Sequence, residues 1–552
     1  MIRLENTLEK MMPSNPNRQI NKIVSKSESG SFAASAQLVQ IYSEGMMGAP
    51  VDVEKVHYYR IKCAEQLTSA NLRLASLKLM GYRGFESLDI PFSQKSNVTV
   101  LVGNNGSGKS SVLDAIQKSL THFVSRLSTR SYNGDQLDEF DISNGATFAT
   151  VIPEFKVAET SFSFELSQSR PMIEPRKKSK FTELNEIGNL YRLANTEKKE
   201  LSLPLLASYT VERANDVTTK DIEESDEILS SHTWDKSKAY SKSLTGKADF
   251  KLFFRWFKEQ VESENDESSD IKVIKAQIES KESEINSSLM KSILSNPETV
   301  ETGEILIKQY KDQINELQEQ LNEKSNVGNK SLDSVRNAIY KFLPGFSDLK
   351  LKRAPLDMVV KKDGQEFSVL QLSQGEKSVL ALIADIARRL TMLNPSLANP
   401  LEGSGLVLID EVDLHLHPSW QQKIMQRLES TFPNLQFIVT THSPQVCHTL
   451  DSDNIWLLKD GKKFNAPKGV RGAVSSWVLK NLFYVEERPP EDEITQLFNK
   501  YKELVYADQY DSAEALKARE VLIDNFGKDY DEIVELDLYI ENKEWEKEFE
   551  ED

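Results

Sequence analysis

A glycine-rich turn at residues 101–110, LVGNNGSGKS, constrains this chain more than any other part of the sequence. It matches the phosphate-binding pattern G-x-x-x-x-G-K-[ST], and the apolar run that ends at Val102 predicts a strand just before it. Glycines at 103, 106 and 108 let the backbone N–H groups turn inward around an anion, and the following helix directs the positive end of its dipole there. We therefore expect a phosphate-binding loop between a buried strand and a helix.

The residues of this turn have different expected roles in binding a nucleotide. Lys109 would bind the β and γ phosphates, and Ser110 would give its hydroxyl to Mg²⁺. The rest of the phosphate cradle would come from Gly103, Asn104, Asn105, Gly106, Ser107, Gly108 and Ser111. ATP with Mg²⁺ is the ligand that these residues predict.

A second apolar strand, LVLIDE at 406–411, ends in two carboxylates. A continuous apolar run of this length is typical of a strand buried in a parallel sheet. Asp410 would then reach the magnesium ion, and Glu411 would orient or deprotonate the water that attacks ATP. Paired acids at a strand end are commonly loop residues, but a phosphate loop upstream favours the catalytic interpretation.

A third apolar strand is followed by a histidine. In FIVTTHSP, at 437–444, His442 could sense the γ-phosphate, whereas a lone histidine is otherwise often structural. His415 and His417 invite a metal-site interpretation, which the chain's two cysteines and seven histidines do not favour.

The segment LQLSQGEKSVLALIADIARRL predicts a second helix whose N-terminus can bind an anion, at Ser373, Gln374 and Gly375. It lies far beyond the phosphate loop in the chain. It would be redundant for the nucleotide held by Lys109 unless it contacts the nucleotide of a second molecule.

Charge is concentrated at one end of the chain. Of a net charge of −17, residues 486–552 hold 23 acidic and 8 basic residues, which leaves the remainder near neutral. Bulk charge therefore does not predict a nucleic-acid binder. The densest basic run, which we interpret as a solvated loop, is Arg176, Lys177, Lys178 and Lys180.

Apolar patterning predicts a cytoplasmic protein that does not enter the membrane. The longest apolar stretch, 379–384, is far too short to span a bilayer, and MIRLENTLEKMMPSN lacks the apolar core of a signal peptide. Cys63 and Cys447 stand far apart, so we expect buried thiols and no disulfide framework.

Segments with helical periodicity lie before and after the expected ATPase core, and a third is inserted within it. Residues 36–64 predict a helical hairpin broken by Gly45, Gly48 and Pro50, and it resembles a Sel-one-like repeat, with a lone capping hairpin equally open. Between 264 and 326 a heptad seam predicts a short antiparallel arm with a break at SNPET, 295–299. The final segment is helical and acidic, interpreted as a solvated cap or as a docking surface for a basic partner.

We expect five regions along the chain. They are a helical N-terminal region at 1–77, the first half of an ATPase head at 78–260, the arm at 261–331, the second half of the head at 332–485 and the acidic helical region at 486–552. The expected class is α/β, with a P-loop head of the ATP-binding cassette type.

The set GNNGSGKS, LSQGEKS, LIDEVDLHLHP and THSP, in this order, resembles the ATP-binding cassette ATPases of the SMC, RecF and OLD group. That resemblance implies a head-to-head homodimer in which Ser373 and Gly375 of one copy touch the γ-phosphate held by Lys109 of the other. The chain departs from the usual cassette pattern at Gln374, Glu376 and His417, and its Q-loop glutamine has only a weak candidate, Gln136.

Within this group, the short arm and the segments LPLLASYTVER and FKLFFRWFKEQVESEN resemble the PtuA family, the ATPase subunits of Septu anti-phage defence, in their retron-linked form. The resemblance implies an HNH endonuclease partner similar to PtuB. In retron-linked systems it also implies a reverse transcriptase with its multicopy single-stranded DNA. We expect ATP binding and hydrolysis to regulate that nuclease.

Other functions stay open at this point. A DNA-repair ATPase that grips DNA, as RecF and SMC relatives do, would favour a longer arm or a basic head. An OLD-like nuclease could use Asp451 and Asp453, but the segment after them predicts no strand-rich domain, so we interpret both as loop acids. The long helical insertion before LSQGEKS disfavours a transporter cassette.

Overall fold

The computed structural model describes residues 16–128, 134–197, 201–215, 236–295, 300–326 and 330–551. Two compact units divide the chain, Met1–Gly472 and Ala473–Asp552. The N-terminal sequence MIRLENTLEKMMPSN and most of the SNPET break lie outside the described residues. In the part of the chain that is described, no helix has the length and apolar character needed to cross a membrane.

A six-stranded sheet forms the centre of the first unit, in the order β14-β13-β3-β12-β11-β7. Its strands are β3 (Val98–Val102), β7 (Leu205–Tyr209), β11 (Gly405–Ile409), β12 (Leu435–Thr440), β13 (Ile455–Lys459) and β14 (Lys462–Asn465). All neighbours are parallel except β13 and β14. The carboxyl ends of β3, β7, β11 and β12 therefore meet at one edge, which explains why the motifs follow buried apolar runs.

An antiparallel sheet packs beside this one. It consists of β1 (Leu72–Tyr82), β2 (Phe85–Pro91), β4 (Phe148–Val157), β5 (Thr160–Ser163) and β6 (Leu166–Ser169). Helix α5 (Lys109–Ser128) follows the phosphate loop and contacts both sheets. Phe123 of α5 packs edge-on against Phe155 and Phe162, so aromatic burial fixes this helix over the strands. The strands predicted around the phosphate loop are confirmed, and β1 already begins at Leu72.

The second half of the head contributes a small sheet and several helices. The sheet is β8 (Phe346–Arg353), β9 (Leu356–Lys362) and β10 (Gln365–Ser368). The helices are α12 (Lys330–Phe342), α13 (Gln374–Leu393), α14 (Pro418–Thr431) and the single turn α15 (Pro444–Cys447). α13 is buried along its length, and α12 packs on it.

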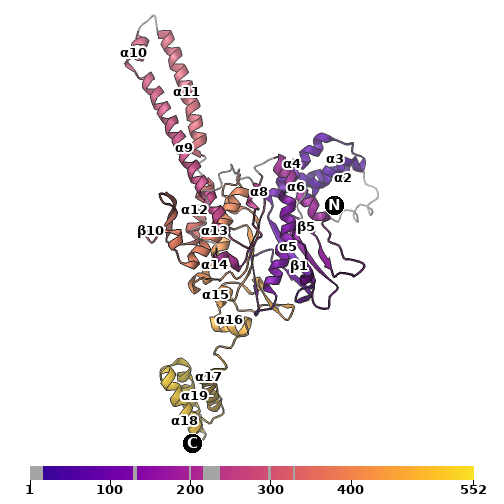
Figure 1. Ribbon diagram of the computed structural model, residues 1–552, viewed down its shortest axis with the longest axis vertical. Helices are drawn as coiled ribbons and strands as arrows, with labels where there is room; N and C mark the ends of the chain where they lie inside the picture. The colour runs from indigo at the N-terminus through magenta and orange to yellow at the C-terminus, as the bar shows by residue number, and fades with distance from the viewer. Residues whose placement is uncertain are drawn as a thin grey trace. The chain divides into compact units, whose positions relative to one another are not determined.

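The predicted arm is an antiparallel helical hairpin. It is built by α9 (Phe250–Ile285), α10 (Ser288–Ser295) and α11 (Val300–Asn326), and Figure 1 shows α9 and α11 running side by side. Ile274 and Ile314 are buried in its seam. α9 begins inside the head, where Phe253, Trp256 and Phe257 are buried, and then continues into the arm. The helix is thus a rigid connection between the two.

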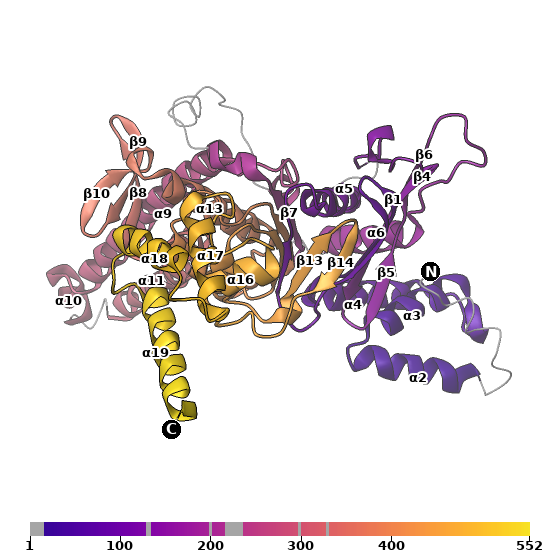
Figure 2. The ribbon, with the colours of Figure 1, turned by 90° about the horizontal axis from the view of Figure 1, so that it is seen from below.

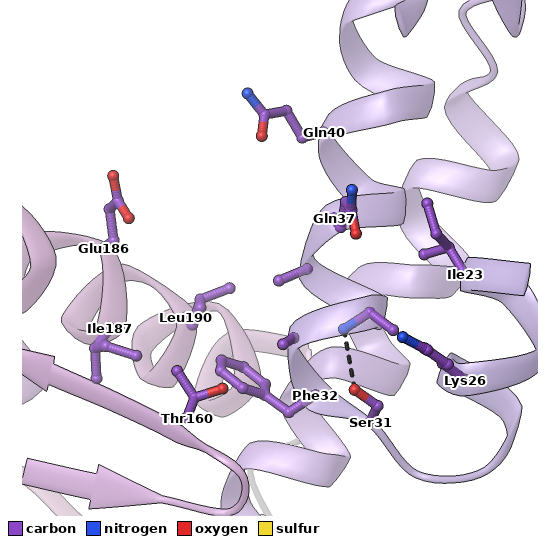
Figure 3. Close-up of a pocket in the computed structure, with 13 residues that line it drawn as sticks. Ile23, Lys26, Ser31, Phe32, Gln37, Gln40, Thr160, Glu186, Ile187 and Leu190 are labelled. Carbon is purple, nitrogen blue, oxygen red and sulfur yellow. Dashed lines mark hydrogen bonds between the residues drawn. The ribbon is translucent and has the colours of Figure 1, made fainter. Parts of the chain in front are cut away.

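Three N-terminal helices, α2 (Pro16–Glu28), α3 (Phe32–Glu44) and α4 (Val53–Ser69), lie beside β5 and α6 (Thr182–Glu197), as Figure 2 shows. Glu159 fixes them there, because it accepts hydrogen bonds from Ser31 Oγ at 2.6 Å and from Ala33 N at 3.3 Å. Figure 3 shows Phe32 directed at the head beside a cavity of about 340 Å³. α3 and α4 match the predicted hairpin, whereas α2 was not predicted.

The second unit contains a helical bundle with its own core. The bundle is formed by α17 (Glu493–Tyr506), α18 (Ala513–Phe526) and α19 (Asp531–Glu551), and α16 (Ser475–Leu482) precedes it in the same unit. The core consists of Phe498, Tyr501, Val505, Ala515, Ala518, Leu522, Ile533 and Leu536. The acidic segment is therefore folded, as its apolar periodicity predicted, and the unit starts before the expected boundary at 486.

Candidate nucleotide-binding site

The phosphate loop leaves β3 and turns directly into α5. Two of its glycines are required by close contacts. A Cβ on Gly103 would lie 2.3 Å from the carbonyl oxygen of Leu458, and a Cβ on Gly108 would lie 2.4 Å from the Phe85 ring. Gly108 also has φ +95°, a conformation that side chains disfavour. The loop can keep this shape only with glycine at both positions.

Lys109 folds back over its own loop. Its Nζ donates to the carbonyl oxygens of Gly103 at 2.8 Å and Asn104 at 3.2 Å. Burial lowers the pKa of Lys109, while the charges of Asp410 and Glu411 act in the opposite direction. A largely buried ammonium surrounded by backbone oxygens is arranged to receive an anion, because phosphate oxygens would complete its partners.

Asp410 stands at the end of β11, opposite the start of α5. Ser110 Oγ donates to Asp410 Oδ2 at 3.2 Å, and Thr440 Oγ1 donates to Oδ1. Two oxygen donors, one hydroxyl and one carboxylate, thus face each other beside the phosphate loop. This pair has the chemistry that Mg²⁺ prefers.

Glu411 adopts an unusual backbone conformation. Its φ of +47° lies in the left-handed region, which non-glycine residues rarely occupy. Thr440 holds it from one side, since Glu411 N donates to Thr440 Oγ1 at 2.7 Å. Strained backbone of this kind persists only where surrounding contacts fix it, and it is common at functional sites.

Arg213, in the short 3₁₀-helix η3 (Val211–Asn215), holds the same segment from the other side. Its guanidinium donates to the carbonyl oxygens of Asp410 and Glu411, and to that of Thr210 at 3.0 Å. The side chain is 2% exposed. Burial lowers its pKa to about 10, although Asp410, Asp413 and Glu411 act against that shift. It remains a cation, and it fixes the peptide that carries both acids.

Sequence reasoning missed Arg213 and Thr440 as site residues. Arg213 lies nearly 200 residues before Glu411 and becomes its neighbour only because β7 pairs with β11. The available signal was a polar segment, TVER, that follows a buried strand at the same sheet edge. Thr440 is the last residue of β12 and lies inside the segment FIVTTHSP, in which we considered only His442 as a site residue.

His442 is exposed and follows β12 directly. The residues on either side of it are anchored to the loop after Glu411 and to α14. Thr441 Oγ1 donates to Asp413 at 2.5 Å, and Ser443 Oγ donates to Gln421 at 2.7 Å. The backbone of this segment is therefore fixed, and the exposed side chain of His442 lines the cavity described next.

These groups surround a cavity of about 330 Å³. It is lined by Asn105, Gly106, Gly108, Lys109, Ser110, Ser111, Asp410, Glu411 and His442. The structure thus brings together most of the loop residues, both acids and the histidine that sequence analysis predicted. Gly103, Asn104 and Ser107 lie in the loop behind this lining, where Ser107 Oγ is buried without a hydrogen-bond partner in the described chain.

The residues fit a nucleotide triphosphate with magnesium. Lys109 and the loop amides would hold the phosphates, while Ser110 and Asp410 would hold the metal. When bound, Mg²⁺ would neutralise phosphate charge. Glu411 contributes a carboxylate to the same cavity, where it can accept a proton from water.

Ser373, Gln374 and Gly375 are not among the described residues that line this cavity. Ser373 caps α13, and its N–H and hydroxyl donate to Glu376 at 3.0 Å and 2.8 Å. Burial raises the pKa of Glu376, but Lys362 at 2.7 Å and Ser373 outweigh it and hold the pKa below its ordinary value. Ser373 and Gln374 are exposed on the surface of this chain.

The remaining candidates lie elsewhere. Gln136 is outside the cavity, and its amide donates to Gly134 O at 3.3 Å. Asp451 pairs with Arg471 at 3.2 Å. Neither the D-x-D pair nor His415 and His417 belongs to a metal cluster, since the described residues contain no group of three or more potential ligands. Both cysteines are buried, as expected.

Comparison with known proteins places these features in context. Residues 98–447 match the family described as "AAA domain, putative AbiEii toxin, Type IV TA system". The chain is 52% identical to "Retron Ec83 probable ATPase" of Escherichia coli over 99% of this chain and all of the relative. It is 33% identical to "Retron Vc95 probable ATPase" of Vibrio cholerae, covering 88% of this chain and 94% of the relative.

Other likenesses are more distant or cover less of the chain. A Septu protein PtuA of Bacillus mycoides is 31% identical over 24% of this chain and 18% of the relative. Among solved structures, the Smc head domain of Pyrococcus furiosus is 16% identical, covers 71% of this chain and 96% of its own, and has a TM-score of 0.35.

Proposed function

This chain belongs to the AAA-domain family and is a relative of the retron ATPases, and we propose that ATP closes two copies head to head and thereby regulates a separate HNH endonuclease. The chain is an ATPase, and the retron and Septu relatives associate it with anti-phage defence. ATP-dependent pairing and the nuclease partner go beyond those relatives' names.

One observation carries the proposal. A single copy holds the phosphate loop, both acids and His442 around one cavity, while the anion-binding end of α13 is exposed outside it. A helix N-terminus directs the positive end of its dipole outward, which favours a phosphate group there. A second copy related by two-fold symmetry would supply that end to the γ-phosphate and would receive the same in return.

Within each composite site the roles follow from position. Lys109 and the loop bind phosphate oxygens, and Ser110 with Asp410 holds Mg²⁺. Glu411 accepts a proton from the attacking water, and His442 contacts the γ-phosphate. Ser373, Gln374 and Gly375 of the partner copy would stabilise charge on that phosphate.

The loop after Glu411 supplies a physical connection between cavity and pairing surface. A Cβ on Gly375 would lie 2.4 Å from His415 O, so this loop packs directly against the start of α13. His415 is also held at φ +62°. A change at Glu411 on ATP binding or hydrolysis would therefore be transmitted over a few residues to the surface that pairs.

The proposed partners are a PtuB-like HNH nuclease and, as in other retrons, a reverse transcriptase with its multicopy single-stranded DNA. The retron and Septu names of the relatives support this choice. ATP would set whether the nuclease is held or free to act.

The test combines two variants at the cavity. Glu411→Gln keeps the shape of the side chain but cannot accept the proton, so ATP should persist and trap paired copies, seen as a doubling of mass by light scattering. Lys109→Ala should lose ATP binding by at least a hundredfold in calorimetry and should not pair. Asp453→Asn, a loop acid away from the cavity, is the matched control and should behave as wild type.

Two outcomes would contradict the proposal. If Glu411→Gln with ATP has the same mass as the nucleotide-free protein, ATP does not drive pairing. If Lys109→Ala binds ATP as tightly as wild type, the phosphate site is misplaced.

A further inference from the structure

Helix α19 in the second unit has two apolar faces. Ile533 and Leu536 lie in the core of the bundle at 0% and 3% exposure. Val534, Leu538 and Trp545 are 39%, 53% and 67% exposed. Their spacings of four and seven residues place these three side chains in one row along the helix, on the face turned away from Ile533 and Leu536.

The exposed row is not needed to hold the bundle together. The bundle core is formed by other residues of α17, α18 and α19, and the ion pair of Arg519 with Asp537 at 2.7 Å further joins α18 to α19. Single exposed apolar residues are ordinary on protein surfaces. Three large ones aligned on one helix face, bordered by polar residues, are typical of an interaction site.

The surroundings of the row determine the charge of its partner. α19 contains ten acidic residues and two lysines. The exposed side chains Asp531 and Glu535 border the row, and exposed Glu541 lies within it, between Leu538 and Trp545. Of the two lysines, Lys543 is paired with Glu546 at 2.9 Å. A second copy of this surface would bring like charges together, and nucleic acid would be repelled in the same way.

We propose that Val534, Leu538 and Trp545 form a docking surface for a positively charged amphipathic segment of another protein. Apolar side chains of that segment cover the row, and its lysines and arginines lie against the acidic borders. This is the arrangement by which an amphipathic helix binds an apolar groove with charged flanks. The surface is separate from the ATP cavity and goes beyond the ATPase function.

A site-specific cross-linker tests the proposal directly. A photoreactive phenylalanine derivative replaces Leu538 in the full chain, expressed with its native gene neighbourhood, and cross-linked peptides are identified by mass spectrometry. The matched position is Leu516 on α18, which is 56% exposed but lies outside the row. Leu538 should capture one defined peptide of net positive charge at least fivefold more efficiently than Leu516 does.

The captured protein then allows a binding measurement. Leu538→Glu and Val534→Glu should each weaken its affinity at least tenfold, Leu516→Glu should change it less than twofold, and raising the salt concentration should weaken it further. ATP turnover should be unchanged in all three, so this result is independent of the pairing test. Capture of a neutral or acidic peptide, capture of this same chain, equal capture at both positions, or unchanged affinity in the row variants would overturn the proposal.

Discussion

At the residue scale, the site depends on how one peptide is held. Glu411, whose carboxylate we propose as the acceptor of the proton from water, has a backbone with φ +47°, and Thr440 and Arg213 hold that backbone from opposite sides. A carboxylate displaced by about 1 Å can lose two orders of magnitude in rate, because it no longer reaches the attacking water. Arg213 is thus a positioning residue that acts through Glu411 without touching the nucleotide site itself.

Arg213→Lys tests this role. Lysine keeps the charge but cannot donate to several carbonyl oxygens in a planar fork. We expect kcat for ATP to fall roughly tenfold or more while KM changes less than threefold, because the phosphate loop is untouched. Arg170→Lys is the matched control, since Arg170 also donates to two backbone oxygens, those of Ala146 and Ser143, away from the cavity.

The account of Arg213 would be wrong if both variants lose activity equally, or if Arg213→Lys raises KM and leaves kcat intact. Circular dichroism at the assay temperature separates either result from simple unfolding.

Residues of the site differ in how readily they can be predicted from the sequence. Lys109, Asp410, Glu411 and His442 follow apolar strands in recognisable patterns, because phosphate and metal chemistry fixes residue types at short spacing. Arg213 has no such pattern. Its position depends on the pairing of strands far apart in the chain, which periodicity alone does not reveal.

At the element scale, buried ionic groups hold the helices around the sheet. Asp385 on α13 is fully buried between Arg388 at 2.6 Å and Arg389 at 2.8 Å, and Tyr209 at the end of β7 donates to it at 2.9 Å. Burial raises the pKa of Asp385, but the two arginines outweigh it and hold the pKa below its ordinary value. This cluster ties the helix that begins at Ser373 to the strand beside the acids, a link that amphipathic patterning could not predict.

α5 provides a pH-dependent prediction. His122 is 1% exposed, and its Nε2 lies 3.0 Å from Asp135 O. Burial lowers its pKa from 6.5 to about 4. The unfolded chain therefore takes up a proton near pH 6.5 but the folded chain only near pH 4, so stability is full above pH 6.5 and decreases as the pH falls toward 4.

The expected contribution of His122 is about 2 kcal/mol of unfolding free energy lost between pH 7 and pH 4.5. Urea titrations at pH 7 and pH 4.5 measure the loss of unfolding free energy in wild type and in His122→Gln. The contribution of His122 is the loss in wild type minus the loss in the variant. Equal losses in both proteins would show that His122 does not titrate on unfolding.

At the scale of the whole molecule, the head, arm, N-terminal helices and acidic bundle were predictable as kinds of structure, since each has its own periodicity and charge. Their exact limits were less predictable. α9 crosses from head to arm without a break, and the second unit begins at residue 473, before the first helix of the acidic bundle. The N-terminus of α13 was predicted from its sequence as an anion-binding end for a second copy, whereas the outer row of α19 became apparent only in the folded chain, because it depends on which side of the helix faces the bundle core.

The central claim is that each ATP site takes residues from two copies, and a mixing experiment tests it most directly. Lys109→Ala lacks a working phosphate loop, and Ser373→Asp keeps a helix cap but opposes the γ-phosphate with a negative charge. Each variant alone should hydrolyse ATP at less than about a tenth of the wild-type rate, since every composite site lacks one partner.

An equal mixture should recover activity. Lys109→Ala copies do not pair with one another, but one of them can pair with a Ser373→Asp copy around the single intact site that holds ATP. If about half of the copies are in such mixed pairs, each with one working site of two, the rate should reach about a quarter of wild type. A mixture that hydrolyses ATP only at the average of the two single variants would contradict the account, because it would mean that no site is shared between copies.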